Sequence, residues 1–149
     1  MQQFLRDYDL GSGLTYEDYA DFGKFIGIYV SEIEPNSGHY NWDDPHFKHY
    51  CTQNSIQQKG TKAKRVQHNH FWFDADKPSN MLPKDVAHNF LRHIRNAFSH
   101  GGISVTRGKH NRKYYSIRDR NIRGSQTMSG KIRSDLLWGM IEILIRSRI

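Results

Sequence analysis

Residues 91–102 read LRHIRNAFSHGG, and this stretch decides how the fold of the chain is interpreted. It closes a helix predicted over residues 83–99, whose apolar side chains recur at helical spacing. That apolar stripe consists of Val86, Phe90, Ile94, Ala97 and Phe98. Gly101 and Gly102 then provide the left-handed residue with which many helices end. The C-terminal end of this predicted helix therefore carries arginine, asparagine, serine and histidine side chains.

The remaining sequence predicts three more helices and one hairpin. Apolar residues recur at helical spacing over residues 14–34 and 44–58, and again over residues 129–148 at the end of the chain. Two β-type runs, ISVT and KYYSI, flank a polar turn after the glycine pair. Residues 59–82 indicate no regular element. We therefore expect a single domain over residues 1–149 that is mostly α, a helical bundle with a β-hairpin inserted before the last helix.

Composition limits the classes of protein. The chain has 149 residues, of which 13% are aromatic, so it can bury a core and disorder is excluded. Cys51 is its single cysteine, so no internal disulfide can form. The N-terminus lacks a basic start followed by an apolar run, and Glu142 interrupts the longest apolar patch. We therefore expect neither a secretory signal nor a membrane span, but a soluble, cytoplasmic protein with no membrane partner.

The net charge of +7 is unevenly distributed. Residues 1–34 hold two basic residues and seven acids, whereas residues 107–123 hold seven basic residues, one acid and two adjacent tyrosines. Basic groups for phosphates and aromatic rings for bases are what single-stranded nucleic acids require. The alternative is a charged hairpin that is merely solvated. On the first interpretation, the substrate-binding residues of this segment are Arg112, Lys113, Tyr114, Arg118 and Arg120.

The helix end combines two side chains suited to RNA cleavage. Arg95 and His100 would diverge by about 140° on an ideal helix, but the glycines free His100 to turn back toward Arg95. An imidazole can accept the proton of a ribose 2′-hydroxyl near neutral pH, and a guanidinium can bind the phosphate as charge builds on it. The alternative is an ordinary basic helix whose last-turn histidine is favoured by the helix dipole. A second Arg-x4-His pattern, Arg65 to His70, lacks the helix and the glycines.

With these residues in view, RNAFSHGG at residues 95–102 resembles the signature of HEPN domains, an arginine and a polar residue followed after three to five residues by histidine. Those domains are small helical bundles, and many are metal-independent endoribonucleases of toxin, abortive-infection and CRISPR-associated systems. The resemblance implies that Arg95 binds the phosphate, that Asn96 orients the site and that His100 is the catalytic histidine. It also implies a homodimer with one composite site, and it leaves room for a separate antitoxin or regulatory protein.

The sequence thus predicts a metal-independent endoribonuclease that cleaves single-stranded or looped RNA by attack of the 2′-hydroxyl, in a toxin or phage-defence context. No cofactor is expected, and no metal either, because the paired histidines lack cysteine or carboxylate partners at ligand-like spacing. Arg92, His93 and Ser99 are expected to bind substrate at the edge of the site. One alternative is a catalytically inactive HEPN module that binds RNA or a protein partner, and another is a DNA-binding helical bundle that uses the basic hairpin.

Overall fold

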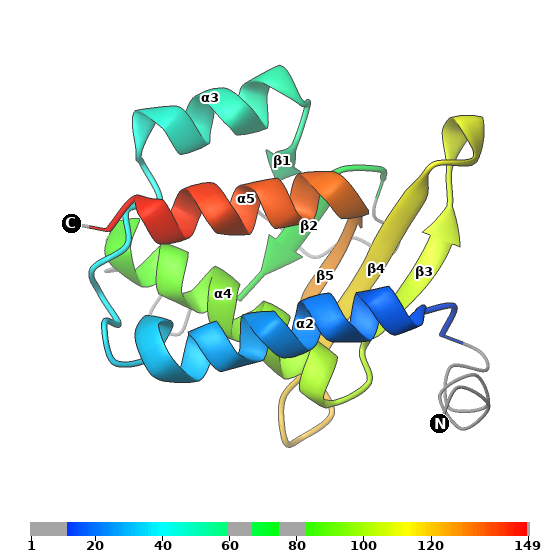
Figure 1. Ribbon diagram of the computed structural model, residues 1–149, viewed down its shortest axis with the longest axis horizontal. Helices are drawn as coiled ribbons and strands as arrows, with labels where there is room; N and C mark the ends of the chain where they lie inside the picture. The colour runs from blue at the N-terminus through cyan, green and yellow to red at the C-terminus, as the bar shows by residue number, and fades with distance from the viewer. Residues whose placement is uncertain (1–11, 60–66, 75–82, 149) are drawn as a thin grey trace.

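The computed structural model describes residues 12–59, 67–74 and 83–148, and their architecture is α+β. The helices are α2 (Tyr16–Ile28), which continues into a π-helical turn (Tyr29–Ile33), α3 (Pro45–Gln53), α4 (Pro83–Ser99) and α5 (Ser134–Arg146). The strands are β1 (Gln57–Gln58), β2 (His70–Phe73), β3 (Ile103–Arg107), β4 (Lys113–Arg120) and β5 (Gln126–Arg133). The five strands form one sheet in the order β1-β2-β5-β4-β3, in which only the β1–β2 pair is parallel. Helices α2, α4 and α5 cover one face of the sheet, and α3 packs on α5 (Figure 1).

The expectation of a mostly α, HEPN-like helical bundle is wrong, and so is the all-α class, because a five-stranded sheet forms the core together with the helices. The hairpin of β3 and β4 is confirmed, but β4 turns again into β5, of which the sequence analysis assigned residues 129–133 to the last helix. In β5 the alternating residues Met128, Gly130 and Ile132 face the core, which is the period of a strand. Ile132 also lies at helical spacing from the apolar face of α5, and this ambiguity produced the error.

The helices were predicted better than the strands. Helix α4 occupies residues 83–99 as expected, and α2 with its π-helical turn lies inside the expected residues 14–34. Helix α3 ends at Gln53, five residues earlier than expected, and Ser55 just beyond it has a positive φ of 56°. Helix α5 begins only at Ser134. In the stretch for which no element was predicted, residues 70–73 form β2, whereas residues 60–66 and 75–82 lie outside the described parts of the chain.

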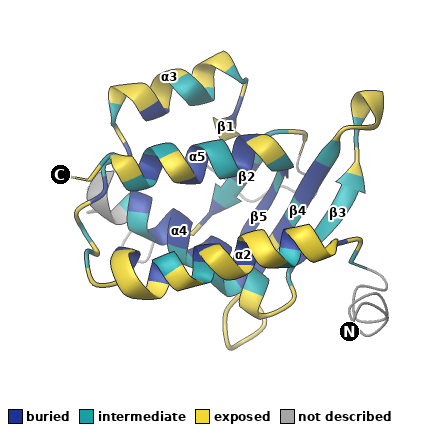
Figure 2. Ribbon diagram, in the orientation of Figure 1, coloured by how far each residue is buried: buried dark blue, intermediate teal, exposed yellow. Residues whose placement is uncertain are grey.

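Helix α4 lies in the core, where it packs against β4, α2 and the π-helical turn, and much of its surface is buried (Figure 2). Its buried residues occupy more than one side of the helix, so it is covered both by strands and by helices. An aromatic cluster joins it to β2 and to the loop before α3, where Trp42 contacts Phe71, Phe73 and Phe90 with ring centroids 5.4–6.2 Å apart. This packing fixes α4, and hence its C-terminal end, relative to the sheet. Among the described residues, no helix is long and apolar enough to cross a membrane.

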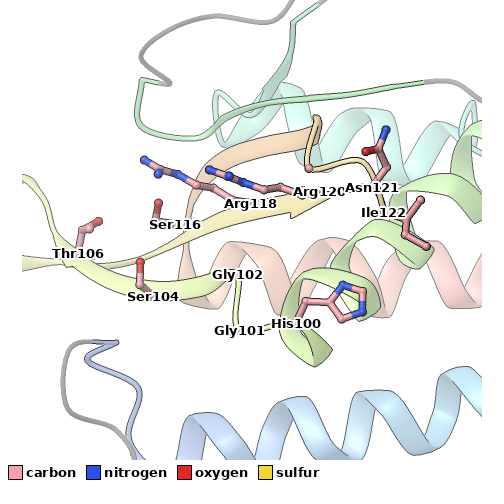
Figure 3. Close-up of a pocket in the computed structure, with 11 residues that line it drawn as sticks. His100, Gly101, Gly102, Ser104, Thr106, Ser116, Arg118, Arg120, Asn121 and Ile122 are labelled. Atoms are coloured by element: carbon pink, nitrogen blue, oxygen red, sulfur yellow. The ribbon is translucent and has the colours of Figure 1, made fainter.

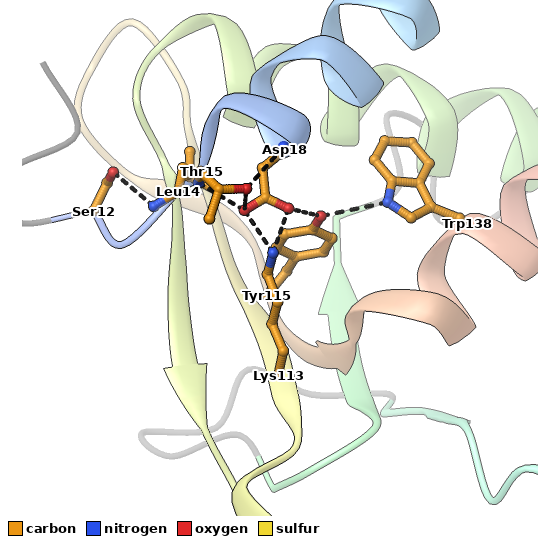
Figure 4. A network of polar contacts seen from close by, with 7 residues as sticks. All are labelled: Ser12, Leu14, Thr15, Asp18, Lys113, Tyr115 and Trp138. Carbon is orange, nitrogen blue, oxygen red and sulfur yellow. Dashed lines mark hydrogen bonds and ion pairs between the residues drawn. The ribbon is translucent and has the colours of Figure 1, made fainter. Parts of the chain in front are cut away.

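A buried polar network joins α2 to β4 and α5 (Figure 4). The Asp18 carboxylate accepts hydrogen bonds from Lys113 Nζ and from the Tyr115 hydroxyl, each at 2.6 Å, and it also completes a capping box with Thr15. Trp138 Nε1 donates to the Tyr115 hydroxyl at 3.4 Å. Burial alone would raise the pKa of Asp18, but the hydrogen bonds from Lys113, Thr15 and Tyr115 outweigh it and hold this pKa below 3.8. The network therefore stabilises the folded state with Asp18 ionised.

Replacing Asp18 with Asn is expected to lower the free energy of unfolding by about 2 kcal/mol near neutral pH, because the buried partners lose their charged acceptor. The folded-state pKa of Asp18 lies below its unfolded-state value, so its contribution is complete above that value and is lost as the pH falls through the folded-state pKa. The difference in stability between the wild type and Asp18→Asn, measured by urea unfolding, should therefore shrink between pH 6 and pH 3. The exposed Asp21→Asn variant is the control, and an equal difference at both pH values would contradict this role.

Candidate nucleic-acid interface

Helix α4 ends in a Schellman motif built by the two glycines. Gly101 has a φ of +73°, the left-handed conformation that glycine adopts without strain. The Gly101 N–H donates to the Phe98 carbonyl at 3.2 Å, and the Gly102 N–H donates to the Ala97 carbonyl at 2.6 Å. The first glycine is therefore required by the turn. His100 is the last residue before this turn, and its side chain is exposed.

The second glycine is required by packing rather than by its φ. The Arg118 N–H of β4 donates to the Gly102 carbonyl at 2.8 Å, so the turn lies against the strand. A Cβ atom at Gly102 would overlap the carbonyl oxygen of Arg118. Only a residue without a side chain lets the end of α4 approach β4 this closely, and the approach places His100 beside the strand that carries Arg118.

A second link between α4 and β4 is buried. His93 Nδ1 is hydrogen-bonded to Asp119 Oδ2 at 2.7 Å, and the two side chains are 4% and 3% exposed. His93 Nε2 lies 3.4 Å from the carbonyl oxygen of Asp74. The sequence analysis expected His93 to bind substrate, but the structure places it inside the core. Its position fixes the part of β4 on which Arg118 and Arg120 flank Asp119.

His100 lines a cavity of about 970 Å³ on the sheet face that the helices leave uncovered (Figure 3). Arg118 and Arg120 extend side by side from β4 at one end of it, while the His100 imidazole lies at the other end, near Asn121 and Ile122. The remaining lining residues are small or hydroxylic: Gly101, Gly102, Ser104, Thr106, Ser116 and Gly124. Neither guanidinium forms an ion pair or hydrogen bond with another residue of the described segments. Within the described segments, the cavity thus offers two cations without an ion-pair partner, hydroxyl groups and one imidazole, and its lining includes no acid.

A second groove on the helix layer has a different character. It measures about 620 Å³ and lies between α2 and α5. Its lining includes Phe25, Trp138 and Ile141, and its acids are Asp21, Glu32 and Glu142. These three carboxylates outnumber the two basic lining residues, Lys24 and Arg146, and Arg146 is paired with Glu142. Carboxylates repel phosphate groups, so this groove is less suited to a polyanion. Charge therefore favours the cavity at His100 as the nucleic-acid interface.

The structure does not bring Arg95 to this cavity. Its guanidinium carbon lies 5.0 Å above the ring of Tyr29, on the side where α4 packs against the π-helical turn. Burial raises the pKa of the Tyr29 hydroxyl, and the Arg95 charge opposes that rise. Arg92 donates to Asn89 Oδ1 at 3.0 Å. Asn96 is half-buried and Ser99 is exposed, and neither lines the cavity at His100.

The predicted hairpin residues are also divided. Arg118 and Arg120 line the cavity, but the Lys113 ammonium group forms an ion pair with Asp18. Tyr114 is buried beneath His68, with ring centroids 4.4 Å apart. Arg112 is exposed at the turn between β3 and β4, away from the cavity lining. Strand geometry explains the position of Lys113, because successive side chains of β4 point to opposite faces of the sheet. Tyr114 shares the face of Arg118, but His68 covers its ring.

The sequence analysis missed Asn121, Ile122 and Gly124 in the turn after β4, and it also missed three hydroxyl-bearing residues of the cavity. Ser104 and Thr106 on β3 and Ser116 on β4 line the cavity, and all three point away from the core. The available signal was their alternation with Ile103, Val105 and Tyr115 at a period of two. Hydroxyl groups beside arginines are suited to binding phosphate and ribose oxygens.

No family model matches the chain, and no curated protein or solved structure matches it. The resemblance of residues 95–102 to the HEPN signature therefore stays a prediction. Within the described segments, no group of three or more histidine, cysteine or acidic side chains is arranged to hold a metal ion.

Substitutions at the two glycines should distinguish the contribution of the left-handed turn at Gly101 to stability from that of the close packing at Gly102. Gly101→Ala strains a left-handed residue and should cost about 1 kcal/mol of stability, whereas Gly102→Ala must displace β4 and should cost about 3 kcal/mol. Gly101→Asn is the matched control, because asparagine tolerates the left-handed region. Urea unfolding measures all three variants. Equal losses for the two alanine variants would mean that the close approach of Gly102 to Arg118 is not required.

Proposed function

We propose that the protein binds single-stranded RNA in the cavity at the end of α4 and cleaves it without a metal, with His100 as general base. The observation that carries the proposal is that His100, Arg118 and Arg120 line one cavity, whose lining within the described segments includes no acidic residue. The spacing of Arg95, Asn96 and His100 resembles that of HEPN ribonucleases and supports the choice of His100, whereas Arg95 lies over Tyr29 outside the cavity. A role in a toxin or phage-defence system is part of the same proposal.

The chemistry assigned to each group follows from its type. The His100 imidazole takes the proton of the ribose 2′-hydroxyl, and the 2′-oxygen then attacks the adjacent phosphorus. The P–O5′ bond breaks, leaving a 2′,3′-cyclic phosphate on one product and a 5′-hydroxyl on the other. Arg118 and Arg120 hold phosphate oxygens by charge-assisted hydrogen bonds. Both are exposed and can change rotamer, which they must do to approach the phosphate next to His100.

RNA binding without cleavage is a second candidate, and a specific observation favours it. The guanidinium groups of Arg118 and Arg120 extend away from His100, and Arg95 lies over Tyr29. In this arrangement no cation faces the imidazole across a single phosphate. A nucleic-acid-binding protein needs only the cations and the hydroxyl groups, so it would tolerate this separation.

A homodimer would complete the site for cleavage. His100 is the single imidazole that lines the cavity, whereas the reaction also needs a proton donor for the departing 5′-oxygen. A two-fold axis beside the end of α4 would set a second His100 across the same RNA strand. Sedimentation should then give twice the chain mass of 17.5 kDa, and the cleavage rate per chain should fall on dilution. A separate antitoxin or regulatory protein remains part of the proposal, with no surface assigned to it.

The decisive experiment is cleavage of a single-stranded RNA in EDTA by the wild type and three variants. His100→Ala should abolish cleavage with little loss of RNA affinity, since the surface substitution removes the base but not the cations. Arg118→Gln and Arg120→Gln should each weaken binding and reduce the log–log salt dependence by about 0.7, the value of one single-strand phosphate contact. Arg112→Gln, outside the cavity, is the matched control for charge.

Each outcome selects one function. Binding of RNA without cleavage by the wild type would leave only the second candidate. Cleavage by His100→Ala at the wild-type rate would remove His100 from the mechanism, and an unchanged rate on RNA with a 2′-O-methyl group at the cut site would exclude attack by the 2′-oxygen. If a matched DNA strand binds as tightly as RNA and neither is cut, the protein is a general single-strand binder.

A further inference from the structure

We propose that Trp72 is the stacking surface for an unpaired base and forms a nucleotide subsite next to the cavity at His100. This inference rests on the function proposed above and extends it, because it names an unstacked single strand as the substrate and assigns it a direction across the sheet.

The position of Trp72 follows from the strand register. Trp72 pairs with Ser129 in the β2–β5 ladder, and Ser129 pairs with Arg118 in the β4–β5 ladder. Directly opposite residues of antiparallel strands point to the same face, so these three side chains form one row across the uncovered face of the sheet. With strands about 4.8 Å apart, Trp72 lies on the order of 10 Å from Arg118 at the level of the backbone. A strand whose phosphate binds Arg118 would therefore reach Trp72 with a neighbouring base.

The other two tryptophans have structural partners. Trp42 lies in the aromatic cluster around Phe90, and Trp138 packs against Phe22 and donates to Tyr115. Trp72 is partly exposed between the buried Phe71 and Phe73 of its strand, and its ring contacts no aromatic or cationic side chain in the described segments. A tryptophan on a solvent-facing sheet surface contributes little to the core. Indole is, however, well suited to stacking on a base.

The row offers polar groups beside the ring. Ser129 is 5% exposed, and its hydroxyl finds no hydrogen-bond partner among the described residues. It lies between Trp72 and Arg118 in the register, but its hydroxyl is buried, so Trp72 and Arg118 are the side chains of this row that a ligand can reach. In the adjacent row, Lys131 pairs with His70 and Ser116, so a further cation borders the same path. Tyr114 also belongs to this face, but His68 already covers its ring.

The subsite predicts a preference for unpaired strands. A base that stacks on Trp72 must leave its own helical stack, which costs little free energy in a single strand and more in a duplex, where base pairing is also lost. Duplex RNA should therefore bind less tightly than the same strand alone. The strand would run from the cavity at His100, past Arg118, toward β2.

The test is a cycle that combines a protein variant with an abasic nucleotide. A 2′-O-methyl RNA of about ten nucleotides, which cannot be cleaved by 2′-oxygen attack, is titrated against the protein by fluorescence anisotropy. Trp72→Leu should weaken binding about ten-fold, within the range measured for loss of one base–aromatic stack, whereas Trp72→Phe should retain most of the affinity. Tyr16→Leu is the matched control, because Tyr16 is 67% exposed on α2, in the helix layer.

An abasic site is then moved along the RNA one position at a time. One position should weaken binding to the wild type about as much as Trp72→Leu does, and the same position should have no further effect on the Trp72→Leu variant. The wild-type tryptophan emission should fall on RNA addition, and this quenching should be absent in Trp72→Phe, which keeps the test valid if Trp72→Leu does not fold. Equal abasic penalties in both proteins, or equal quenching in wild type and Trp72→Phe, would overturn the subsite alone. Failure of the wild type to bind any RNA would overturn the proposed function together with it.

Discussion

The close approach of Gly102 to Arg118 is the constraint on which the arrangement of the candidate site depends. The hydrogen bond between their backbones joins the end of α4 to β4, and the absence of a side chain at Gly102 makes it possible. The buried His93–Asp119 pair joins the same two elements a few residues away. Together they bring the last residue of a central helix to the uncovered face of a sheet. His100 and the two arginines reach one cavity because of this junction, although they come from different elements.

The two faces of the sheet therefore carry different kinds of side chain and have different roles. The inner face is apolar and joins the core around α4, while Asp18, Lys113 and Tyr115 satisfy one another at its edge near α2. The outer face carries serine, threonine, arginine and tryptophan side chains at alternating positions. A strand can serve both faces at once, because its side chains alternate between them. The basic segment of the sequence is therefore divided: Lys113 stabilises the fold, and Arg118 and Arg120 remain available to a ligand.

Sequence reasoning succeeded where a pattern was local. The α4 helix, its glycine stop and the β3–β4 hairpin follow from spacing and turn residues. His100, predicted to be catalytic, and Arg118 and Arg120, predicted to bind substrate, line one cavity, and their roles stay predictions. Sequence reasoning failed where a pattern was short or where it fitted both a strand and a helix. Strand β2 has four residues and pairs with a strand more than fifty residues away, and β5 contains an isoleucine in phase with the next helix.

The pairing of Arg95 with His100 shows why local geometry was not enough. Residues five apart point in different directions on a helix, and the expectation was that the glycine stop would let His100 turn back toward Arg95. The helix does end at the glycines, but the chain there places His100 near β4, while Arg95 stays over Tyr29. Which side His100 reaches is decided by the contact between Gly102 and Arg118. Gly102 and Arg118 are sixteen residues apart, and the pairing of strands brings them together. The spacing of side chains along a helix could therefore not reveal this contact.

The central claim is that single-stranded RNA binds the uncovered sheet face beside the end of α4. Amide chemical-shift mapping by NMR, with a 2′-O-methyl RNA added to the wild-type protein, tests it most directly. The account predicts that the largest shifts occur at Gly101, Gly102, Ser116, Arg118 and Ser129, with little change along α2. Largest shifts at Lys24, Ile28 and Ile145, in the groove between α2 and α5, would contradict it.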